Sequence, residues 1–224
     1  MKRIGCFHAH YSNIEHIDKA LQAFDAELVH FVDPGLDRIK MDADFTQETV
    51  EKKVMETLAW IASCHVDAIL ITCTFFTAVF DAEHHRFPIP VIKIDEPLFE
   101  AICQVNQPVV VAFTNPNTVT GTMNQLFAYA SKRGKEVDAK PVLLENTFEL
   151  IMQGRKSEYI RLVAERLIQF TAENPGKYLA AAQLSMVPAA QIAQNRTNLA
   201  VGNHLESLAD YLKELLNLEV RKEH

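Results

Sequence analysis

The stretch Asp67-Ala-Ile-Leu-Ile-Thr-Cys-Thr-Phe-Phe-Thr-Ala-Val-Phe80 decides the predicted fold. Residues 68–71 are all apolar, which is typical of a strand buried on both faces of a parallel sheet. A helix-like segment follows, so Cys73 is expected where a strand ends and a helix begins. A helix N-terminus favours a thiolate, and open α/β sheets bind ligands at the carboxyl ends of their strands. Cys73 is therefore the first candidate for a chemically active residue; the alternative is a cysteine that only fills the core.

Apolar runs and amphipathic segments alternate along the rest of the chain. Further strands are predicted over 3–7, 28–32, 91–94, 108–113, 141–144, 177–182 and 199–201. Helices are predicted over 14–24, 47–63, 119–133, 157–174 and 204–216, with Ser12 or Asn13 as a cap for the first and Thr46 at the beginning of the second. Trp60, at helical spacing, is expected in the core. This order predicts an α/β protein with parallel sheets covered by helices on both faces.

The two halves of the chain repeat the same order of elements. Cys73 corresponds to Gln183, an offset of 183 − 73 = 110 residues, and His8 corresponds to Phe113, an offset of 113 − 8 = 105. Both halves have polar residues at matching strand ends. We therefore expect two pseudo-symmetric domains, 1–96 plus 203–224 and 97–202, with the site in the cleft between them.

Composition limits the classes of function. The chain has 224 residues, 48% of them hydrophobic, and a net charge of −7, which argues against nucleic acid as a partner. Its four cysteines are widely spaced and suggest neither a disulfide framework nor a zinc knuckle. No apolar run approaches the ~20 residues of a membrane span, and no signal peptide precedes the first predicted strand. A cytoplasmic protein that does not bind membranes is the expectation.

Taken together, these features resemble the aspartate/glutamate racemase superfamily, which includes hydantoin racemases, maleate isomerases and arylmalonate decarboxylases. The likeness covers most of the chain and is carried by Ile71-Thr72-Cys73-Thr74, Ile94-Asp-Glu-Pro97, Thr114 to Thr118 and Ala182-Gln-Leu-Ser-Met186. The resemblance implies two flavodoxin-like α/β lobes and cofactor-independent proton abstraction next to the carboxylate of a small acid or amino acid. In such racemases, one cysteine from each domain acts on each face of the substrate. Homo-oligomers are common among these enzymes, although no stretch here predicts one.

The chain departs from this pattern in its second half. Cys73 matches the first family cysteine, but Gln183 stands at the position of the second, with Ser185 two residues further on. An amide cannot carry a proton, and an unactivated serine hydroxyl is too weak an acid or base. The expected function is therefore a racemase- or isomerase-like enzyme that uses the Cys73 thiolate. The alternatives are a decarboxylase-type lyase, although those relatives keep the other cysteine, or a non-catalytic protein that binds small carboxylates.

These considerations give the candidate site. The candidate catalytic residues are Cys73, His8, Ser185 and Gln183. The candidate substrate-binding residues offer backbone N–H groups at two helix starts, side-chain hydroxyls, or a carboxylate for the second face of the substrate: Ser12, Thr74, Phe75, Thr114, Asn117, Thr118 and Glu96.

Cys6, His8 and His10 are expected to alternate on one strand face, and such a set of nitrogen and sulfur ligands is compatible with zinc. His8 also lies near the position at which the glutamate racemases carry an acidic residue beside the first cysteine, so it could instead polarise Cys73. The third interpretation is that Cys6 is core and both histidines line a polar cleft. We assign no metal and no cofactor from the sequence.

Overall fold

The computed structural model describes residues 1–39, 42 and 45–221. The chain divides into two compact units, which we describe separately. Unit 1 comprises Met1–Ile94 and the C-terminal segment from Leu208, and unit 2 comprises Asp95–Ser207. Each unit contains a four-stranded sheet whose strands are all parallel. The predicted α/β class is confirmed.

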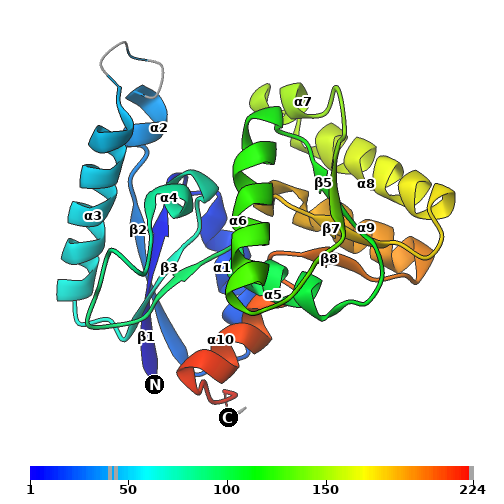
Figure 1. The fold of residues 1–224 in the computed structure, drawn as a ribbon. Helices are drawn as coiled ribbons and strands as arrows, with labels where there is room; N and C mark the ends of the chain where they lie inside the picture. The colour runs from blue at the N-terminus through cyan, green and yellow to red at the C-terminus, as the bar shows by residue number, and fades with distance from the viewer. Residues whose placement is uncertain (40–41, 43–44, 222–224) are drawn as a thin grey trace. The chain divides into compact units, whose positions relative to one another are not determined.

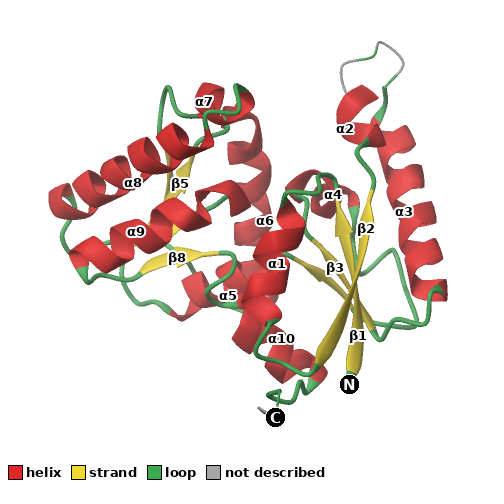
Figure 2. Cartoon of the chain, turned by 180° about the vertical axis from the view of Figure 1, so that it is seen from behind, coloured by secondary structure: helices red, strands yellow, loops and turns green. Residues whose placement is uncertain are grey.

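Unit 1 has the strand order β2-β1-β3-β4. Its strands are β1 (Lys2–His8), β2 (Ala26–Val32), β3 (Ala68–Ile71) and β4 (Val91–Lys93). Its helices are α1 (Asn13–Leu21), α2 (Gly35–Ile39), α3 (Gln47–Ser63), α4 (Thr74–Val79) and α10 (Leu208–Leu216). Helices α3 and α4 pack on one face of this sheet, and α1 lies on the opposite face (Figures 1 and 2).

Unit 2 repeats this arrangement with the strand order β6-β5-β7-β8. Its strands are β5 (Val109–Phe113), β6 (Ala139–Leu143), β7 (Tyr178–Ala181) and β8 (Val201–Asn203). Its helices are α5 (Glu96–Gln104), α6 (Val119–Lys132), α7 (Phe148–Met152), α8 (Lys156–Glu173) and α9 (Val187–Thr197), with short 3-10 turns at Pro116–Thr118 and Leu184–Met186. The core under α8 and α9 lies on one face of the sheet, and that under α5 and α6 lies on the other.

The strand register makes the internal repeat precise. Phe7 pairs with Ile71 in unit 1, and Ala112 pairs with Ala181 in unit 2. Cys73 and Gln183 each follow the third strand of their sheet in chain order, two residues after these paired positions. They are therefore structurally equivalent, as the sequence predicts.

The last two elements differ from the prediction. The strand expected at 199–201 is β8, Val201–Asn203, and the helix expected from residue 204 begins at Leu208. The side chain of Asn203 explains the delay, because its Oδ1 accepts the backbone N–H groups of Leu205 and Glu206, both at 3.1 Å. This local turn uses donors that a helix starting at residue 204 would need.

Trp60 was predicted to lie in the core, and this prediction is wrong. Its side chain is 66% exposed. The buried face of α3 is formed by Val50, Val54, Leu58 and Ile61 at spacings of three and four residues, and Trp60 falls outside that stripe.

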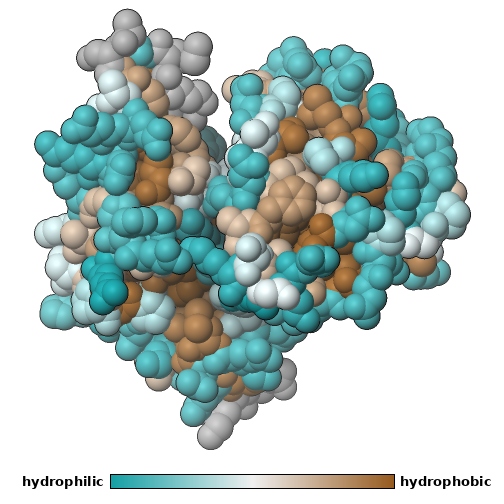
Figure 3. Space-filling view, viewed as in Figure 1, coloured by the Kyte–Doolittle hydropathy of each residue, from teal (hydrophilic) through white to brown (hydrophobic). Residues whose placement is uncertain are grey.

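The face drawn in Figure 3 is largely hydrophilic, with hydrophobic side chains gathered in separate patches. Among the residues that the structure describes, no helix has both the length and the apolar character needed to cross a membrane.

Candidate active site at the carboxyl ends of the strands

Cys73 lies where the sequence places it, between the end of β3 and the start of α4. Its backbone is extended (φ −111°, ψ 118°), and its carbonyl oxygen accepts the N–H groups of Phe76 at 3.0 Å and Thr77 at 2.9 Å. The side chain is half-buried and packs against the core under α3 and α4. The thiol therefore occupies the polar end of a buried strand.

Thr74 and Phe75 form the first turn of α4. Helix geometry directs their backbone N–H groups out of the start of the helix, where no intrahelical acceptor exists. The Phe75 ring is 36% exposed and stacks with Phe45 at a centroid distance of 6.2 Å. These two predicted binding residues thus lie directly beside Cys73 in the chain.

His8 is the last residue of β1 and is fully buried. Its Nδ1 lies 2.7 Å from Thr72 Oγ1, and its Nε2 lies 2.9 Å from His30 Nδ1. Burial lowers the pKa of His8 to about 4, with His30 lowering it further and Asp18 opposing the shift, so the imidazole is neutral near pH 7. Because both ring nitrogens have partners, a direct hydrogen bond to Cys73 would require one of these contacts to break.

The predicted set Cys6, His8 and His10 is not formed. β1 ends at His8, so His10 no longer alternates with it. His10 is exposed, and its Nδ1 lies 2.8 Å from Ser12 Oγ, which is also exposed. The metal-binding donors that do come together are those of Cys6, His8 and His30, all within 4.8 Å of one another.

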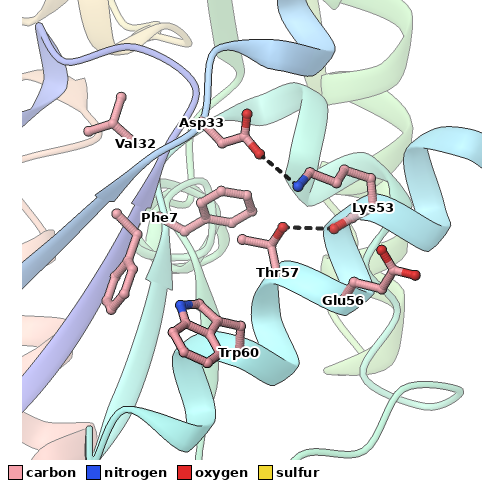
Figure 4. A pocket seen from close by; sticks show the side chains of 8 residues that line it. Phe7, Val32, Asp33, Lys53, Glu56, Thr57 and Trp60 are labelled. Carbon is pink, nitrogen blue, oxygen red and sulfur yellow. Dashed lines mark hydrogen bonds and ion pairs between the residues drawn. The ribbon is translucent and has the colours of Figure 1, made fainter.

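A cavity of about 340 Å³ lies in unit 1 between the end of β2 and helix α3 (Figure 4). Phe7, Phe31 and Trp60 supply aromatic lining, and Lys53 lies 3.2 Å from Asp33 across it. Lys53 is the cation that could attract a carboxylate here, and Asp33 already neutralises its charge. We therefore do not include this cavity in the candidate site.

Gln183 is the best-connected residue at the strand ends of unit 2. Its Oε1 accepts the Thr114 N–H at 2.6 Å, the Thr114 hydroxyl at 2.7 Å and the Asn115 N–H at 3.1 Å. Its Nε2 donates to Thr118 Oγ1 at 3.2 Å. Two of the three donors are backbone N–H groups, which fixes the orientation of the amide. Gln183 therefore fastens the 114–118 loop to the end of β7.

A chain of hydroxyl groups continues from this amide. Thr114 Oγ1 lies 3.1 Å from the Tyr159 hydroxyl, which lies 3.0 Å from Ser185 Oγ. Because Thr114 donates to Gln183, it must accept from Tyr159, and Tyr159 must then accept from Ser185. Burial raises the pKa of Tyr159, which keeps its phenol protonated. The Ser185 hydroxyl proton is therefore already used in this chain, and Ser185 offers only lone pairs to a ligand.

The loop donors predicted for a carboxylate are largely used within the protein. The Asn117 N–H donates to Asn115 Oδ1 at 3.0 Å, and the Thr118 N–H donates to the Asn115 carbonyl at 3.3 Å. The Thr118 hydroxyl donates to the same carbonyl at 3.0 Å. Binding a ligand through these groups would require the loop to exchange its own hydrogen bonds.

The remaining candidate, Glu96, is the first residue of α5 and is half-buried. Asp95 precedes it in the chain. The distance between Asp95 Oδ1 and His204 Nε2 is 2.9 Å, and both side chains are 1% exposed. Asp95 is therefore a buried structural partner within unit 2.

The architecture of the two units identifies the class of fold. Two equivalent units, each with a 2-1-3-4 parallel sheet and a polar residue after its third strand, form the two-domain α/β fold of the racemases. No protein-family model and no curated protein sequence matches the chain.

Solved racemase structures match nearly the whole chain. The aspartate racemase of Picrophilus torridus has a TM-score of 0.70 at 14% identity, covering 99% of this chain and 97% of its own. A glutamate racemase of Bacillus anthracis gives 0.71 at 13% identity, covering 96% and 82%. The allantoin racemase of Klebsiella pneumoniae gives 0.68 at 15% identity, covering 97% and 88%. At these identities the likeness establishes the fold, which is the one that the sequence resemblance predicts.

Proposed function

We propose that the protein is a cofactor-independent, racemase- or isomerase-like enzyme. In this proposal it acts at the carbon next to the carboxylate of a small acid or amino acid, through the Cys73 thiolate. The observation that carries the proposal is the place of Cys73, after the third strand of a sheet in a fold shared with solved racemases. A half-buried thiol at that edge is positioned to meet a ligand.

The chemistry begins with removal of the proton on the carbon by the Cys73 sulfur. The electron pair left on the carbon delocalises into the neighbouring carboxylate, and N–H groups at the start of α4 stabilise the enolate-like intermediate. The thiol then returns a proton to the carbon.

The second face of the intermediate lacks an equivalent carrier at Gln183. Its amide nitrogen is not basic, and its oxygen already accepts three hydrogen bonds. We therefore infer that chemistry on one face dominates. That Glu96 or a histidine carries the proton on the other face stays a prediction from the sequence.

Solvent deuterium exchange tests this proposal. Acidic amino acids and related small acids would be incubated with the enzyme in D2O, and loss of the proton on the carbon followed by NMR. We expect exchange that is faster than loss of optical activity, because the protonated thiol exchanges its proton with D2O and then returns deuterium to the same face of the carbon.

The matched variants are Cys73→Ser, which should abolish exchange, and Cys64→Ser, which should retain it because Cys64 lies at the end of α3, outside the site. Exchange that persists in Cys73→Ser would contradict the proposal. Release of carbon dioxide with deuterium in the product would instead identify the decarboxylase-type alternative.

A second candidate, a non-catalytic carboxylate-binding protein, is favoured by one observation. Gln183 stands at the position of the second family cysteine, and its amide cannot carry a proton for turnover. This candidate predicts that small dicarboxylates raise the melting temperature without any deuterium exchange.

A further inference from the structure

The cluster that the proposed reaction does not use lies on the face of the unit 1 sheet opposite Cys73. Cys6 and His8 are two residues apart on β1 and project from the same face. The strand register places Cys6 directly beside His30 of β2. The donor atoms of these three residues lie within 4.8 Å of one another.

The outer nitrogens of both imidazoles are held by other side chains. His30 Nε2 lies 3.0 Å from Asp18 Oδ1, so this nitrogen carries a proton, since a carboxylate can only accept. With its other proton absent, Nδ1 of His30 directs a lone pair toward His8 Nε2, 2.9 Å away. His8 Nδ1 is in turn held by the Thr72 hydroxyl at 2.7 Å.

This pattern is the one that metal-binding histidines show in proteins. In such sites the nitrogen that does not touch the metal is oriented by a carboxylate, a carbonyl or another hydrogen-bonding group. Here Asp18 orients His30 and Thr72 orients His8. The two inner nitrogens therefore point toward each other on the side where Cys6 lies.

We propose that Cys6, His8 and His30 form a binding site for a zinc ion. One sulfur and two imidazole nitrogens are a donor set that zinc favours, and three protein ligands leave a fourth position for water or a small ligand. The site does not depend on the proposed function, because none of its three ligands is the nucleophile or base of that reaction.

Charge and burial support this assignment. A divalent zinc ion, the Cys6 thiolate and the Asp18 carboxylate sum to zero charge, so the buried ion is compensated. Cys6 and His8 are fully buried, and the His30 side chain is 17% exposed. Entry from the His30 side would release the thiol proton. The His8 proton would move from Nε2 to Nδ1, which then donates to Thr72 Oγ1, while the Thr72 hydroxyl donates to the Phe7 carbonyl 3.2 Å away.

The donor atoms must rearrange to bind zinc, because donors as far as 4.8 Å apart have to approach one another and the two inner nitrogens have to separate. Zinc–nitrogen and zinc–sulfur bonds of about 2.0 and 2.3 Å in a tetrahedron place neighbouring donors roughly 3.3–3.8 Å apart. The 2.9 Å separation of the two inner nitrogens must therefore widen by a few tenths of an ångström. Because His8 also holds Thr72, the residue before Cys73, zinc would stiffen the strand end that carries the thiol.

Cobalt titration tests the site directly. Protein without a histidine tag, freed of metal by a chelator, would be titrated with Co²⁺ and followed by absorbance. We expect one equivalent to give the near-ultraviolet charge-transfer band of a cobalt–thiolate bond, and added Zn²⁺ to remove it. Zn²⁺ should also raise the melting temperature.

Five variants separate this site from other metal binding. Cys6→Ser should lose the charge-transfer band and His30→Gln should lose the thermal shift, whereas Cys73→Ser and His10→Gln should retain both. Asp18→Asn, which removes only an orienting partner, should weaken metal affinity about 10- to 100-fold. Far-ultraviolet circular dichroism of the metal-free variants would show that each one is folded.

A band that survives in Cys6→Ser, or that disappears in Cys73→Ser, would overturn the assignment. So would the absence of a thiolate band in the wild-type protein. In that case Asp18, His30, His8 and Thr72 form a hydrogen-bonded chain that holds no cation.

Discussion

At the scale of single residues, Gln183 is the position on which the two candidate functions differ most. Its place after the third strand of unit 2 follows from the sequence repeat, and the register confirms it. Its three accepted hydrogen bonds could not be predicted, because two donors lie 69 residues and one lies 68 residues away in the chain. The sequence shows only that a thiol is missing, whereas the structure shows what the amide does instead.

Replacement of Gln183 by leucine should destabilise unit 2. The change leaves two backbone N–H groups and the Thr114 hydroxyl without their acceptor, and each such loss typically costs about 1–3 kcal/mol. We expect the free energy of unfolding in denaturant to fall by about 2 kcal/mol or more. Gln183→Glu, which keeps an oxygen acceptor, is the matched control and should lose less. Equal stability of Gln183→Leu and wild type would show that these bonds contribute nothing net.

The proposed zinc ligands show the same limit of local sequence reading. Strand alternation groups Cys6, His8 and His10 as a set compatible with zinc, but β1 ends at His8. His30 is 22 residues from His8 and meets it only because β1 and β2 pair in parallel. The sequence does place His30 inside the predicted strand 28–32. Finding it as a third donor also requires the register between this strand and β1.

At the scale of elements, apolar runs predict the strands, and a side-chain cap marks the start of α3. Thr46 was predicted to begin a helix, and α3 does begin after it, with the Thr46 hydroxyl accepting the Thr49 N–H at 3.2 Å. The start of α10 was wrong because the Asn203 turn forms first. The sequence predicts a helix start correctly at Thr46. It fails before α10, because the side-chain turn at Asn203 competes with the first turn of the helix.

Thr46→Ala should destabilise unit 1 through its longest helix. The change removes the acceptor for an N–H group in the first turn of α3, and N-cap losses of this kind cost about 1 kcal/mol. We expect a loss of that size in denaturant unfolding, with Thr46→Ser close to wild type because it keeps the hydroxyl. If serine destabilises as much as alanine, the cap does not account for the effect.

At the scale of the whole molecule, the two units share one architecture but distribute their polar residues differently. Unit 1 has its thiol at the strand end and a histidine pair on the opposite sheet face, whereas unit 2 has a hydrogen-bonded amide and a chain of hydroxyl groups. Fold class and repeat were predictable because they depend on periodicity. The polar networks were not, because they depend on contacts between distant strands.

Alkaline pH should destabilise the protein through Tyr178. Burial raises the pKa of Tyr178 to about 12 from its ordinary value near 10, with the negative charge of Glu206 adding to the shift. Between these values the unfolded chain loses the phenol proton and the folded protein keeps it, so stability falls as pH rises through this window. Two pKa units correspond to a loss of about 2–3 kcal/mol.

Guanidinium unfolding of the wild type and Tyr178→Phe at pH 9 and near pH 12 would measure this effect. We expect the stability difference between the two proteins to shift in favour of Tyr178→Phe at the higher pH. A difference that is independent of pH would show that Tyr178 ionises normally in the folded protein.

The most direct test of the central claim is the pH dependence of Cys73 alkylation by iodoacetamide. The modified residue would be identified by peptide mass spectrometry, because Cys64 is also partly exposed, and Cys73→Ser would serve as the control. The account predicts a midpoint well below the value of about 8.5 for a free thiol, and slower modification when a small dicarboxylate is present. An ordinary midpoint with no protection by the dicarboxylate would contradict the claim that Cys73 is an activated thiolate in a carboxylate site.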